Sequence, residues 1–575
     1  MQLRVFALDY DGTIAHDDRL DPEVRSAIEQ VRRHTSVVLV TGRILDDLRC
    51  HVGDLSLFDA VVAENGAVVA FPAAGRSNQI APPPPPAFVS ELRRRGLDVR
   101  QGRCVVELRA ADAGAVLEVV RALELPLTLH FNRDRLMVLP QAVSKATGLR
   151  EALRTLRLST HNTIAIGDAE NDHELLAACE FGVAVEWGSA ALRRAADHVV
   201  SGRGPPAVAA FLREHGDNGR IPAPPIVRRS LVLGRDEAGE VVTLAVRGRN
   251  VLITGDPRSG KSWVGGLLCE QLIVQQYCTC VIDPEGDYTE LESLPGVLVL
   301  GNDRAPTMHE LTRAIRYSDV SVIVDLSGIG GQDKHDHVIG TLRLLMELRR
   351  QTGLPHRIVV DEAHYFLHEQ ADVEVLDEGV DGMTLITYRV GGLQPEMLRR
   401  VECAIVTRGT DPEEVRRLHA AFHREDDLAA WIKTLGGLAI DEAVLLPVTA
   451  EAQGRLRRFH IAPRLTRHVR HRHKYLDVAT PGNRAFRFEL DGTQGPVVGS
   501  MRELVHALGC IPVARLVQHV QRGDLSRWIA EVIADKELAA AVRDVEEQHR
   551  LGQLPDFNGA VIRAIRDRYA VTDWV

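Results

Sequence analysis

Lysine is nearly absent from this chain. Of its 69 basic residues, six are lysines and 63 are arginines. The formal net charge of −10 at pH 7 argues against a surface that coats nucleic acid as a whole, although it leaves room for a local basic patch. Because lysine is so rare, the two lysines that lie inside phosphate-binding motifs, Lys145 and Lys261, are more informative than lysines usually are.

Long apolar runs and paired cysteines are also missing. No apolar stretch approaches the ~18 residues that span a bilayer, and the N-terminus lacks the charged and apolar regions of a signal peptide. The eight cysteines form no C-x-x-C pair of the kind that binds metal or performs redox chemistry, so we expect reduced thiols. These absences predict a cytoplasmic protein without a membrane partner.

The length of 575 residues is too great for one hydrophobic core and suggests about three domains. The first part alternates short apolar strands with amphipathic helices, which predicts a mostly parallel, doubly wound α/β sheet. A second α/β region follows, and the tail has two strand-like pieces and then mostly helix. The expected boundaries are 1–215 for the first domain with an α+β cap at about 73–141, 216–229 for a linker, 230–454 for the second domain, 455–475 for a basic bridge and 476–575 for a C-terminal accessory domain.

Two aspartates, Asp9 and Asp11, end the first apolar strand in the segment DYDGT. Residues at the carboxyl ends of parallel strands meet in one crevice. A carboxylate there can attack phosphorus and be phosphorylated briefly, which divides one difficult step into two. The same crevice is expected to receive side chains that follow later strands: Thr41, Lys145, Asp168 and Asp172.

These motifs, in this order, resemble those of the haloacid dehalogenase (HAD) phosphatase superfamily. The segment AENGA at 63–67 and the insertion between Thr41 and Lys145 resemble its Cof-type branch. The resemblance covers the first domain. It implies a HAD Rossmann-like sheet and a small phosphorylated metabolite, of sugar phosphate or phosphoglycolate type, as substrate. One segment departs from the family's pattern, because Glu186-Trp187-Gly188 stands where the family usually has a small Asn-Ala-type turn.

The resemblance also implies a role for each residue of this set. Asp9 would be the nucleophile, and Asp11 would protonate the leaving alcohol and then activate water. Thr41 and Lys145 would bind the phosphoryl oxygens and neutralise developing charge. Mg²⁺ would be held by oxygens of Asp9, Asp11, Asp168 and Asp172.

A glycine-rich turn lies between a strand and a helix in the segment NVLITGDPRSGKSWVGGLL. Its residues Gly255, Gly260, Lys261 and Ser262 fit the spacing G-x-x-x-x-G-K-[ST]. In such a loop, which here includes Ser259, backbone N–H groups and a helix N-terminus form a positive cup for phosphate. The loop predicts ATP binding, with Lys261 at the β- and γ-phosphates and Ser262 on Mg²⁺.

A later apolar strand ends in Asp361 and Glu362, within PHRIVVDEAHYF. Asp361 suits a second carboxylate on the metal side, and Glu362 suits a base that activates the attacking water. The segments CTCVIDPEGDYTEL, VSVIVDLSGIGG and GLPHRIVVDEAHYFL resemble those of the HerA/FtsK-type ATPases, which are ring-forming motors and their relatives. This resemblance implies ATP hydrolysis and assembly of several copies as a ring or a dimer.

Three further residues bear on the second site. Tyr388 stands where the HerA/FtsK family commonly has a polar glutamine sensor. Arg389 and Arg408 are candidates for contacting a γ-phosphate, within one subunit or across a subunit boundary. The alternative is that both arginines are ordinary surface or ion-paired charges.

The segment 455–474 is rich in arginine and histidine. It could bind the backbone of DNA or RNA, contact another subunit, or be solvated and ion-paired charge. A metal site is disfavoured because no cysteine or carboxylate accompanies the histidines at ligand spacing, and few aromatic residues are present for base stacking. Its basic and histidine residues are Arg455, Arg457, Arg458, His460, Arg464, Arg467, His468, Arg470, His471, Arg472, His473 and Lys474.

We therefore expect two enzymes in one chain. The first hypothesis is a Mg²⁺-dependent HAD phosphatase whose activity or assembly is gated by the ATP-binding domain. The second is a nucleic-acid motor of the HerA type whose HAD domain processes nucleotides or phosphate ends. The third is an ATP-dependent assembly platform without turnover.

Overall fold

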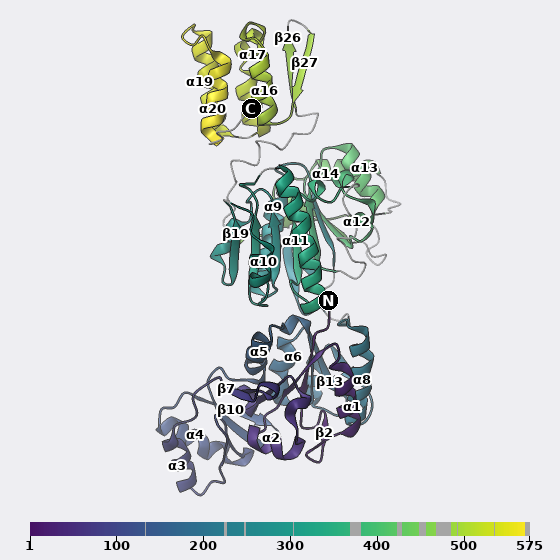
Figure 1. Cartoon of the computed structure of the whole chain (residues 1–575), viewed down its shortest axis with the longest axis vertical. Coiled ribbons are helices and arrows are strands. Elements are labelled where there is room, and N and C mark those ends of the chain that lie inside the picture. The colour runs from purple at the N-terminus through teal and green to yellow at the C-terminus, as the bar shows by residue number, and fades with distance from the viewer. Residues whose placement is uncertain are drawn as a thin grey trace.

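The structure is a computed structural model, in which three bodies are stacked along the long axis (Figure 1). We call them the N-terminal body (residues 1–222), the central body (227–466) and the C-terminal body (485–569). The structure describes residues 1–132, 134–222, 227–246, 249–302, 304–329, 331–368, 381–422, 428–447, 456–466, 485–490, 493–533 and 535–569. Among these residues, no helix is both long enough and apolar enough to cross a bilayer.

The N-terminal body is built on an eight-stranded sheet. Its strands are β1 (Val5–Asp9), β4 (Ser36–Val40), β5 (Ala60–Ala63), β6 (Val68–Phe71), β7 (Arg76–Gln79), β12 (Thr163–Gly167), β13 (Phe181–Val185) and β14 (His198–Val200). The spatial order is β14-β13-β12-β1-β4-β5-β6-β7. The strands from β14 to β5 are parallel, whereas β6 and β7 are antiparallel. Runs such as VFALD are buried along their whole length, as expected for a parallel sheet that is covered on both faces.

Helices cover both faces of this sheet. They are α1 (Pro22–Val31), α2 (Leu45–Val52), α5 (Lys145–Leu156), α6 (His173–Ala178), α7 (Ala190–Ala195) and α8 (Pro205–Asn218). Helices α1, α2 and α8 pack on one face, and α5, α6 and α7 pack on the other. A small antiparallel hairpin of β2 (Ala15–His16) and β3 (Arg19–Leu20) follows β1. The predicted doubly wound sheet is therefore present.

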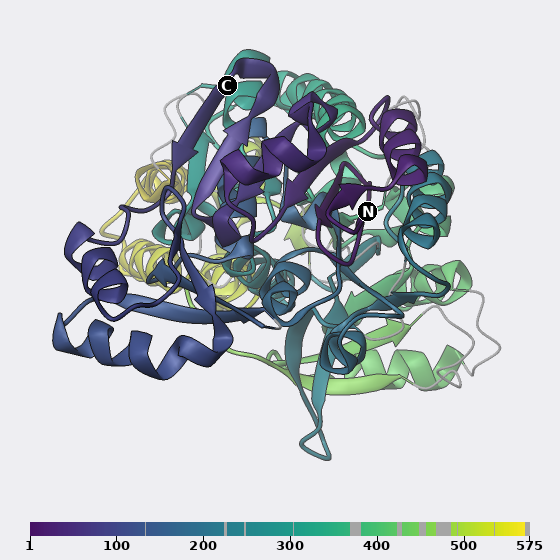
Figure 2. The ribbon, with the colours of Figure 1, turned by 90° about the horizontal axis from the view of Figure 1, so that it is seen from below.

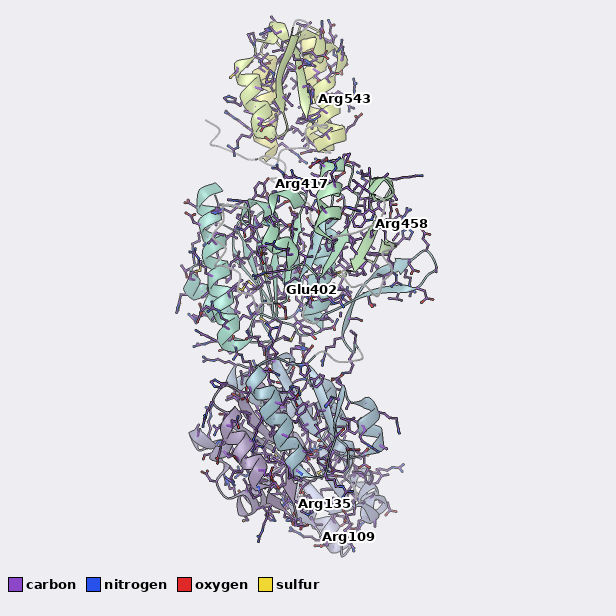
Figure 3. All side chains as sticks on the ribbon, turned by 90° about the vertical axis from the view of Figure 1, so that its right-hand side faces the viewer. Arg109, Arg135, Glu402, Arg417, Arg458 and Arg543 are labelled. Atoms are coloured by element: carbon purple, nitrogen blue, oxygen red, sulfur yellow. The ribbon has the colours of Figure 1, made fainter. Side chains whose placement is uncertain are left out.

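A separate four-stranded antiparallel sheet forms the cap. Its strands are β8 (Arg100–Gln101), β9 (Val106–Arg109), β10 (Leu127–Asn132) and β11 (Arg135–Pro140), and its helices are α3 (Pro86–Arg94) and α4 (Ala113–Ala122). The order is β10-β11-β9-β8. Both helices pack on one face, while Met137 and Leu139 of the other face join the core of the main sheet. Arg109 and Arg135 mark this cap at the end of the molecule opposite Arg543 (Figure 3).

The central body contains an eleven-stranded sheet. Its strands are β15 (Ser230–Asp236), β16 (Val241–Ala245), β17 (Val251–Thr254), β18 (Thr279–Asp283), β19 (Val297–Gly301), β20 (Ser321–Asp325), β21 (Arg357–Val360), β22 (Met383–Thr387), β23 (Cys403–Val406), β24 (Glu442–Pro447) and β25 (Arg457–Ile461). The order is β16-β15-β25-β24-β23-β17-β22-β21-β18-β20-β19. The strands from β23 to β19 are parallel. The β15–β16 hairpin projects sideways from the body (Figure 2).

The central sheet is covered by six principal helices, which are α9 (Lys261–Val274), α10 (Met308–Ala314), α11 (Gly331–Thr352), α12 (Pro395–Arg399), α13 (Pro412–Ala421) and α14 (Leu428–Gly436). Helix α9 packs on one face, and α10, α11, α13 and α14 pack on the other. Because β25 pairs with both β15 and β24, the sheet continues past residue 454, where the sequence predicted the second domain to end.

The C-terminal body combines one hairpin with a group of helices. The elements are β26 (Phe486–Leu490), β27 (Thr493–Val498), α16 (Met501–Cys510), α17 (Val517–Arg522), α18 (Asp524–Trp528), α19 (Lys536–Arg550) and α20 (Phe557–Tyr569). Aromatic side chains, Phe488, Trp528 and Phe557 among them, form its core with aliphatic residues from every helix. The body therefore has a hydrophobic core of its own.

Polar side chains are buried where the N-terminal and central bodies meet. The ring of His161 lies next to Glu180 Oε2 through Nδ1 and next to the carbonyl oxygen of Gln275 through Nε2, at 3.0 Å in both cases. Both neighbours are hydrogen-bond acceptors. Tyr277 stacks on His161 with ring centroids 3.7 Å apart and donates its hydroxyl to Glu180 Oε2 at 2.9 Å.

A second set of contacts continues this junction. Asn162 Oδ1 lies 3.1 Å from His356 Nε2, and His356 Nδ1 accepts a hydrogen bond from the backbone N–H of Cys278 at 2.8 Å. Burial, followed by the neighbouring charge of His161, holds the pKa of His356 well below its ordinary value. We call the five side chains of His161, Asn162, Glu180, Tyr277 and His356 the interbody joint. Each of them is at most 6% exposed.

Candidate functional site

The first candidate site centres on a buried lysine at the carboxyl ends of β1 and β12. Lys145 Nζ donates to Asp9 Oδ1 at 2.5 Å and to Asp172 Oδ1 at 2.7 Å. Asp172 Oδ2 in turn accepts from the backbone N–H of Asp168 at 3.0 Å. Thr13, which the sequence analysis did not select, donates its hydroxyl to Asp9 Oδ2 at 3.1 Å. The structure thus groups Lys145 with Asp9, Asp168 and Asp172, whereas the Asp11 carboxylate contacts Arg43.

Burial and charge oppose each other in this site. Burial raises the pKa of Asp9 well above its ordinary value, and the Asp172 carboxylate adds to the rise, while Lys145 counteracts it. Burial disfavours the charge on Lys145, but Asp172 and Asp9 outweigh it and raise the pKa of the lysine. The lysine is therefore held as a cation between two carboxylates.

The carboxylates fit a divalent cation. Oxygen atoms of Asp9, Asp168 and Asp172 lie within 4.8 Å of one another, and all three residues are buried. Oxygen ligands of this kind suit Mg²⁺. One lysine offsets only part of the charge of three carboxylates, so a second cation would complete the charge balance. The donor set and its electrostatics agree with the expected metal.

Thr41 and the AENGA segment line the same crevice. Thr41 is fully buried, and its hydroxyl oxygen accepts from the backbone N–H of Arg43 at 3.1 Å. The next segment reaches the cap, because the Glu64 carboxylate accepts from the backbone N–H of Arg103, Cys104 and Val105 at 2.7–3.1 Å. Glu64 has a φ of 53°, a conformation that non-glycine residues rarely adopt. The sequence analysis quoted this segment but did not assign the glutamate a role as the anchor of the cap.

The loop that carries Asp11 is held from two sides. Trp187 donates its indole N–H to the Gly12 carbonyl oxygen at 2.6 Å. On the other side, Arg43 donates to both carboxylate oxygens of Asp11. Trp187, which departs from the family's usual pattern, therefore supports the loop that carries Asp11. Arg43 was not among the residues selected from sequence, although it follows Thr41 by two positions.

The second candidate site is the glycine-rich loop between β17 and α9. Gly255 and Gly260 have φ angles of 149° and 102°. A Cβ atom on Gly255 would lie 2.1 Å from Thr407 Oγ1, so only glycine fits there. Lys261 Nζ donates to the backbone carbonyl of Asp256 at 2.8 Å, and Ser259 donates to the same oxygen at 2.7 Å. The loop is thus closed around its own lysine by backbone groups.

Carboxylates from neighbouring strand ends face the start of α9. Ser262 donates its hydroxyl to Asp287 Oδ2 at 2.9 Å. Asp287 is placed by Asp283, whose carboxylate accepts four backbone N–H groups of residues 285–288. Burial, then the charges of Asp287 and Asp361, raise the pKa of Asp283. The sequence analysis used this segment for the HerA/FtsK resemblance but selected neither aspartate as a site residue.

Asp361 and Glu362 follow β21 as expected, and both are buried. The Asp361 carboxylate accepts the backbone N–H of Glu362 at 2.9 Å. Glu362 has a φ of 47°, and its carboxylate lies 3.6 Å from His364 Nδ1. Tyr388, which stands at the expected sensor position, has its ring centroid 6.0 Å from Lys261 Nζ.

The two candidate arginines lie in different surroundings. Arg389 is exposed, and its backbone N–H donates to Thr387 Oγ1 at 2.9 Å. Arg408 is half-buried beside the glycine-rich loop, and its carbonyl oxygen accepts from the backbone N–H of Asp256 at 2.8 Å. A contact of either guanidinium with a γ-phosphate stays a prediction.

The described part of the basic bridge is largely ion-paired. Arg457 contacts Asp236 at 3.0 Å, Arg458 contacts Glu442 at 2.6 Å and Arg464 contacts Glu270 at 2.9 Å. The last pair is buried on both sides. This favours the ion-pair interpretation for these residues. Outside the described residues lie Arg455, Arg467, His468, Arg470, His471, Arg472, His473 and Lys474.

The two sites point in opposite directions from the interbody joint. Strand β12 starts beside Asn162 and ends just before Asp168, while β21 starts beside His356 and ends just before Asp361. Helix α9 starts at Lys261, and Gln275, the residue after its end, contacts His161. The joint therefore connects the amino ends of both sheets, and both candidate sites lie at carboxyl ends.

Known proteins match the N-terminal body. The family model of the haloacid dehalogenase-like hydrolases matches residues 6–80 and 124–212. A phosphoglycolate phosphatase of Natronomonas pharaonis is 32% identical over 204 residues, which are 34% of this chain and 89% of that protein. The chain belongs to the haloacid dehalogenase-like hydrolase family. The HAD resemblance stated from the sequence is thereby confirmed.

A second relative and a solved structure match a similar share of the chain. A phosphoglycolate phosphatase of Methanosarcina acetivorans is 27% identical over 241 residues, which are 38% of this chain and 99% of that protein. Among solved structures, a haloacid dehalogenase-like hydrolase from Bacteroides thetaiotaomicron aligns with a TM-score of 0.32 at 18% identity and covers 37% of this chain and 99% of that one.

Proposed function

We propose that the N-terminal body is a Mg²⁺-dependent phosphatase that acts on a small phosphorylated metabolite of the phosphoglycolate or sugar phosphate type. The observation that carries the proposal is the buried arrangement of Lys145 between Asp9 and Asp172, with Asp168 close enough to share a cation. The substrate class rests on the similarity to phosphoglycolate phosphatases.

The reaction would proceed in two displacements. An oxygen of Asp9 attacks phosphorus, the bond from phosphorus to the leaving alcohol oxygen breaks, and Asp11 gives that oxygen its proton. Asp11, now a carboxylate, takes a proton from the water that attacks the aspartyl-phosphate, which releases inorganic phosphate and restores Asp9. Lys145 and Thr41 would hold the phosphoryl oxygens. Mg²⁺, held by Asp9, Asp168 and Asp172, would supply charge neutralisation on the phosphoryl group.

The test is phosphate release from a panel of phosphomonoesters with Mg²⁺. Because Asp9 supplies the nucleophile, Asp9→Asn is expected to lower the rate by about a thousandfold or more. Its folding is checked by thermal unfolding, and its ATP binding should equal that of the wild type. Equal release of phosphate by both proteins would contradict the assignment of Asp9.

We further propose that the central body binds and hydrolyses ATP. The glycine-rich loop and the N-terminus of α9 offer backbone N–H groups to phosphate, and the positive φ angles of Gly255 and Gly260 agree with such a cradle. Lys261 would exchange its contact with the Asp256 carbonyl for phosphate oxygens. Ser262 and Asp361 would hold Mg²⁺, and Glu362 would activate water. Assembly as a ring or dimer stays a prediction.

The interbody joint supports regulation of the phosphatase by ATP. Helix α9 has 14 residues and is about 21 Å long, and it leads from Lys261 to the His161 contact. A displacement of α9 on nucleotide binding would move His161 and Glu180, and β12 connects this end of the sheet to Asp168. We therefore favour gating of the phosphatase over a nucleic-acid motor, because the described bridge arginines are paired with carboxylates.

A further inference from the structure

Arg43 is a buried cation next to the reacting groups, and the mechanism above gives it no role. It is 7% exposed, whereas the side chain of its partner Asp11 is 37% exposed. We propose that Arg43 is a positioning residue that aims the Asp11 carboxylate at the leaving-group oxygen and ties it to the β2–β3 hairpin. The inference rests on the phosphatase activity proposed above, because it concerns the proton transfer in that reaction.

The contacts of Arg43 fix the plane of the Asp11 carboxylate. Arg43 Nε donates to Asp11 Oδ2 at 2.8 Å and to Oδ1 at 3.0 Å, and Nη2 donates to Oδ1 at 2.5 Å. Two nitrogens of a rigid, planar guanidinium orient a carboxylate, which a single ammonium cannot do. The carboxylate is held by Arg43, and the Asp11 side chain is still 37% exposed. Such a group can exchange a proton with a bound substrate while it keeps its direction.

Arg43 itself is held by its neighbours. Its guanidinium lies over the Tyr10 ring at 5.1 Å from the centroid, a favourable position for a cation. Its backbone N–H donates to Thr41 Oγ1 at 3.1 Å, so the same threonine that would bind phosphate also supports the arginine. The position of the guanidinium is therefore set by the residues that directly follow β1 and β4.

The β2–β3 hairpin supplies a second carboxylate. Asp17 and Asp18 turn the hairpin with φ angles of 47° and 66°. Arg43 Nη2 also contacts Asp18 Oδ1, and Tyr10 donates its hydroxyl to the Asp18 carbonyl at 3.1 Å. One arginine thus binds the proposed acid and the tip of the hairpin together.

The alternative role for Arg43 is direct binding of an anionic group on the substrate. Its Nε and Nη2 atoms already donate to Asp11 and Asp18. A substrate anion would compete with two carboxylates for the same guanidinium. The two roles differ in kinetics, because a binding role raises KM, whereas a positioning role lowers kcat for substrates that need the acid.

The experiment compares two leaving groups. The alkoxide of 2-phosphoglycolate needs a proton as it leaves, whereas the nitrophenolate of p-nitrophenyl phosphate leaves without one. We expect Arg43→Gln to lower kcat on 2-phosphoglycolate by about 10- to 100-fold more than on p-nitrophenyl phosphate, since a positioned acid contributes about 10²–10⁴-fold. Asp11→Asn should show the same selectivity. Asp18→Asn, which leaves the Arg43–Asp11 contact in place, should keep the wild-type ratio between the substrates.

Arg43→Lys separates the effect of orientation from the effect of charge. It also serves as a second variant in case Arg43→Gln does not fold. It keeps a cation and loses the planar fork, so it should restore only part of the rate on 2-phosphoglycolate, with thermal unfolding like that of the wild type. An equal loss on both substrates, or a higher KM with unchanged kcat, would overturn the positioning role while leaving the phosphatase intact. A wild-type protein that hydrolyses neither substrate would instead refute the proposed function.

Discussion

The two candidate sites both place a buried lysine at the carboxyl edge of a parallel sheet, but the partners of the lysines differ. Lys145 contacts two carboxylates, Asp9 and Asp172. Lys261 contacts a backbone carbonyl, that of Asp256. The first lysine balances side-chain charges that can attack phosphorus or hold a metal. The second lies in a loop of backbone donors, which can hold a phosphate without reacting with it.

The carboxylates near the two lysines are also used differently. At the first site, Asp9 and Asp168 are close enough to Asp172 to share one cation. At the second, Asp283 is occupied with four backbone N–H groups and serves to place Asp287. A buried acid beside a phosphate loop is therefore not by itself a metal ligand. Hydrogen-bond partners, more than residue types, distinguish the two candidate sites.

The largest effect is expected from a substitution of Lys145. Lys145→Met removes the cation and leaves Asp9 and Asp172 buried with like charge, which should lower the free energy of unfolding by about 3–5 kcal/mol and abolish phosphate release. The pKa of Asp9 is already raised by burial, and a group with a raised folded-state pKa loses stability as pH rises through that value. Thermal unfolding from pH 5 to pH 8 should therefore show a growing deficit in the variant, which Mg²⁺ reduces. A deficit that shrinks as pH rises would contradict this.

The topology of a parallel sheet explains which parts of the sites could be predicted from the sequence. Asp9, Lys145 and Asp172 follow strand ends, and parallel-sheet topology alone brings strand ends together. Arg43 and Glu64 gave no such signal, because Arg43 joins the loop after β1 to the β2–β3 hairpin and Glu64 contacts the cap. Their contacts depend on how two insertions fold back, which spacing along the chain does not encode.

The boundaries between bodies were harder to predict for the same reason. The segment RRFHI at 457–461 has the composition of a basic linker, yet it is a strand of the central sheet. Its two arginines form ion pairs with Asp236 and Glu442. Composition indicates charge, but only the pairing of β25 with β15 and β24 shows that the charge is structural.

A smaller effect on stability is expected at Lys261. Lys261→Ala removes the hydrogen bond to the Asp256 carbonyl, and the loss of one such bond costs about 1 kcal/mol. The variant should also lose ATP binding, measured by calorimetry. Glu362→Gln should keep ATP binding and lose ATP hydrolysis. Basal phosphate release should be unchanged in both variants. Undiminished hydrolysis in Glu362→Gln would contradict the role of Glu362.

The smallest effect on either chemistry is expected at the interbody joint. His161→Phe keeps the stacking on Tyr277 and removes the hydrogen bonds to Glu180 and Gln275. Because His161 lies far from both sites along β12 and α9, ATP hydrolysis and basal phosphate release should persist, whereas the effect of ATP on phosphate release should be lost. Thr160→Ser, a nearby conservative change, serves as the matched control. A normal ATP effect in His161→Phe would exclude this route of coupling.

We propose that one chain contains two different phosphate-binding sites and that the second regulates the first. The most direct measurement is the rate of phosphate release from 2-phosphoglycolate with and without saturating ATP, in the wild type and in Lys261→Ala. The phosphate that ATP itself releases is subtracted using Asp9→Asn. The coupling proposed here predicts a change of about fivefold or more in the wild type and none in Lys261→Ala. Equal rates in the wild type with and without ATP would contradict the claim.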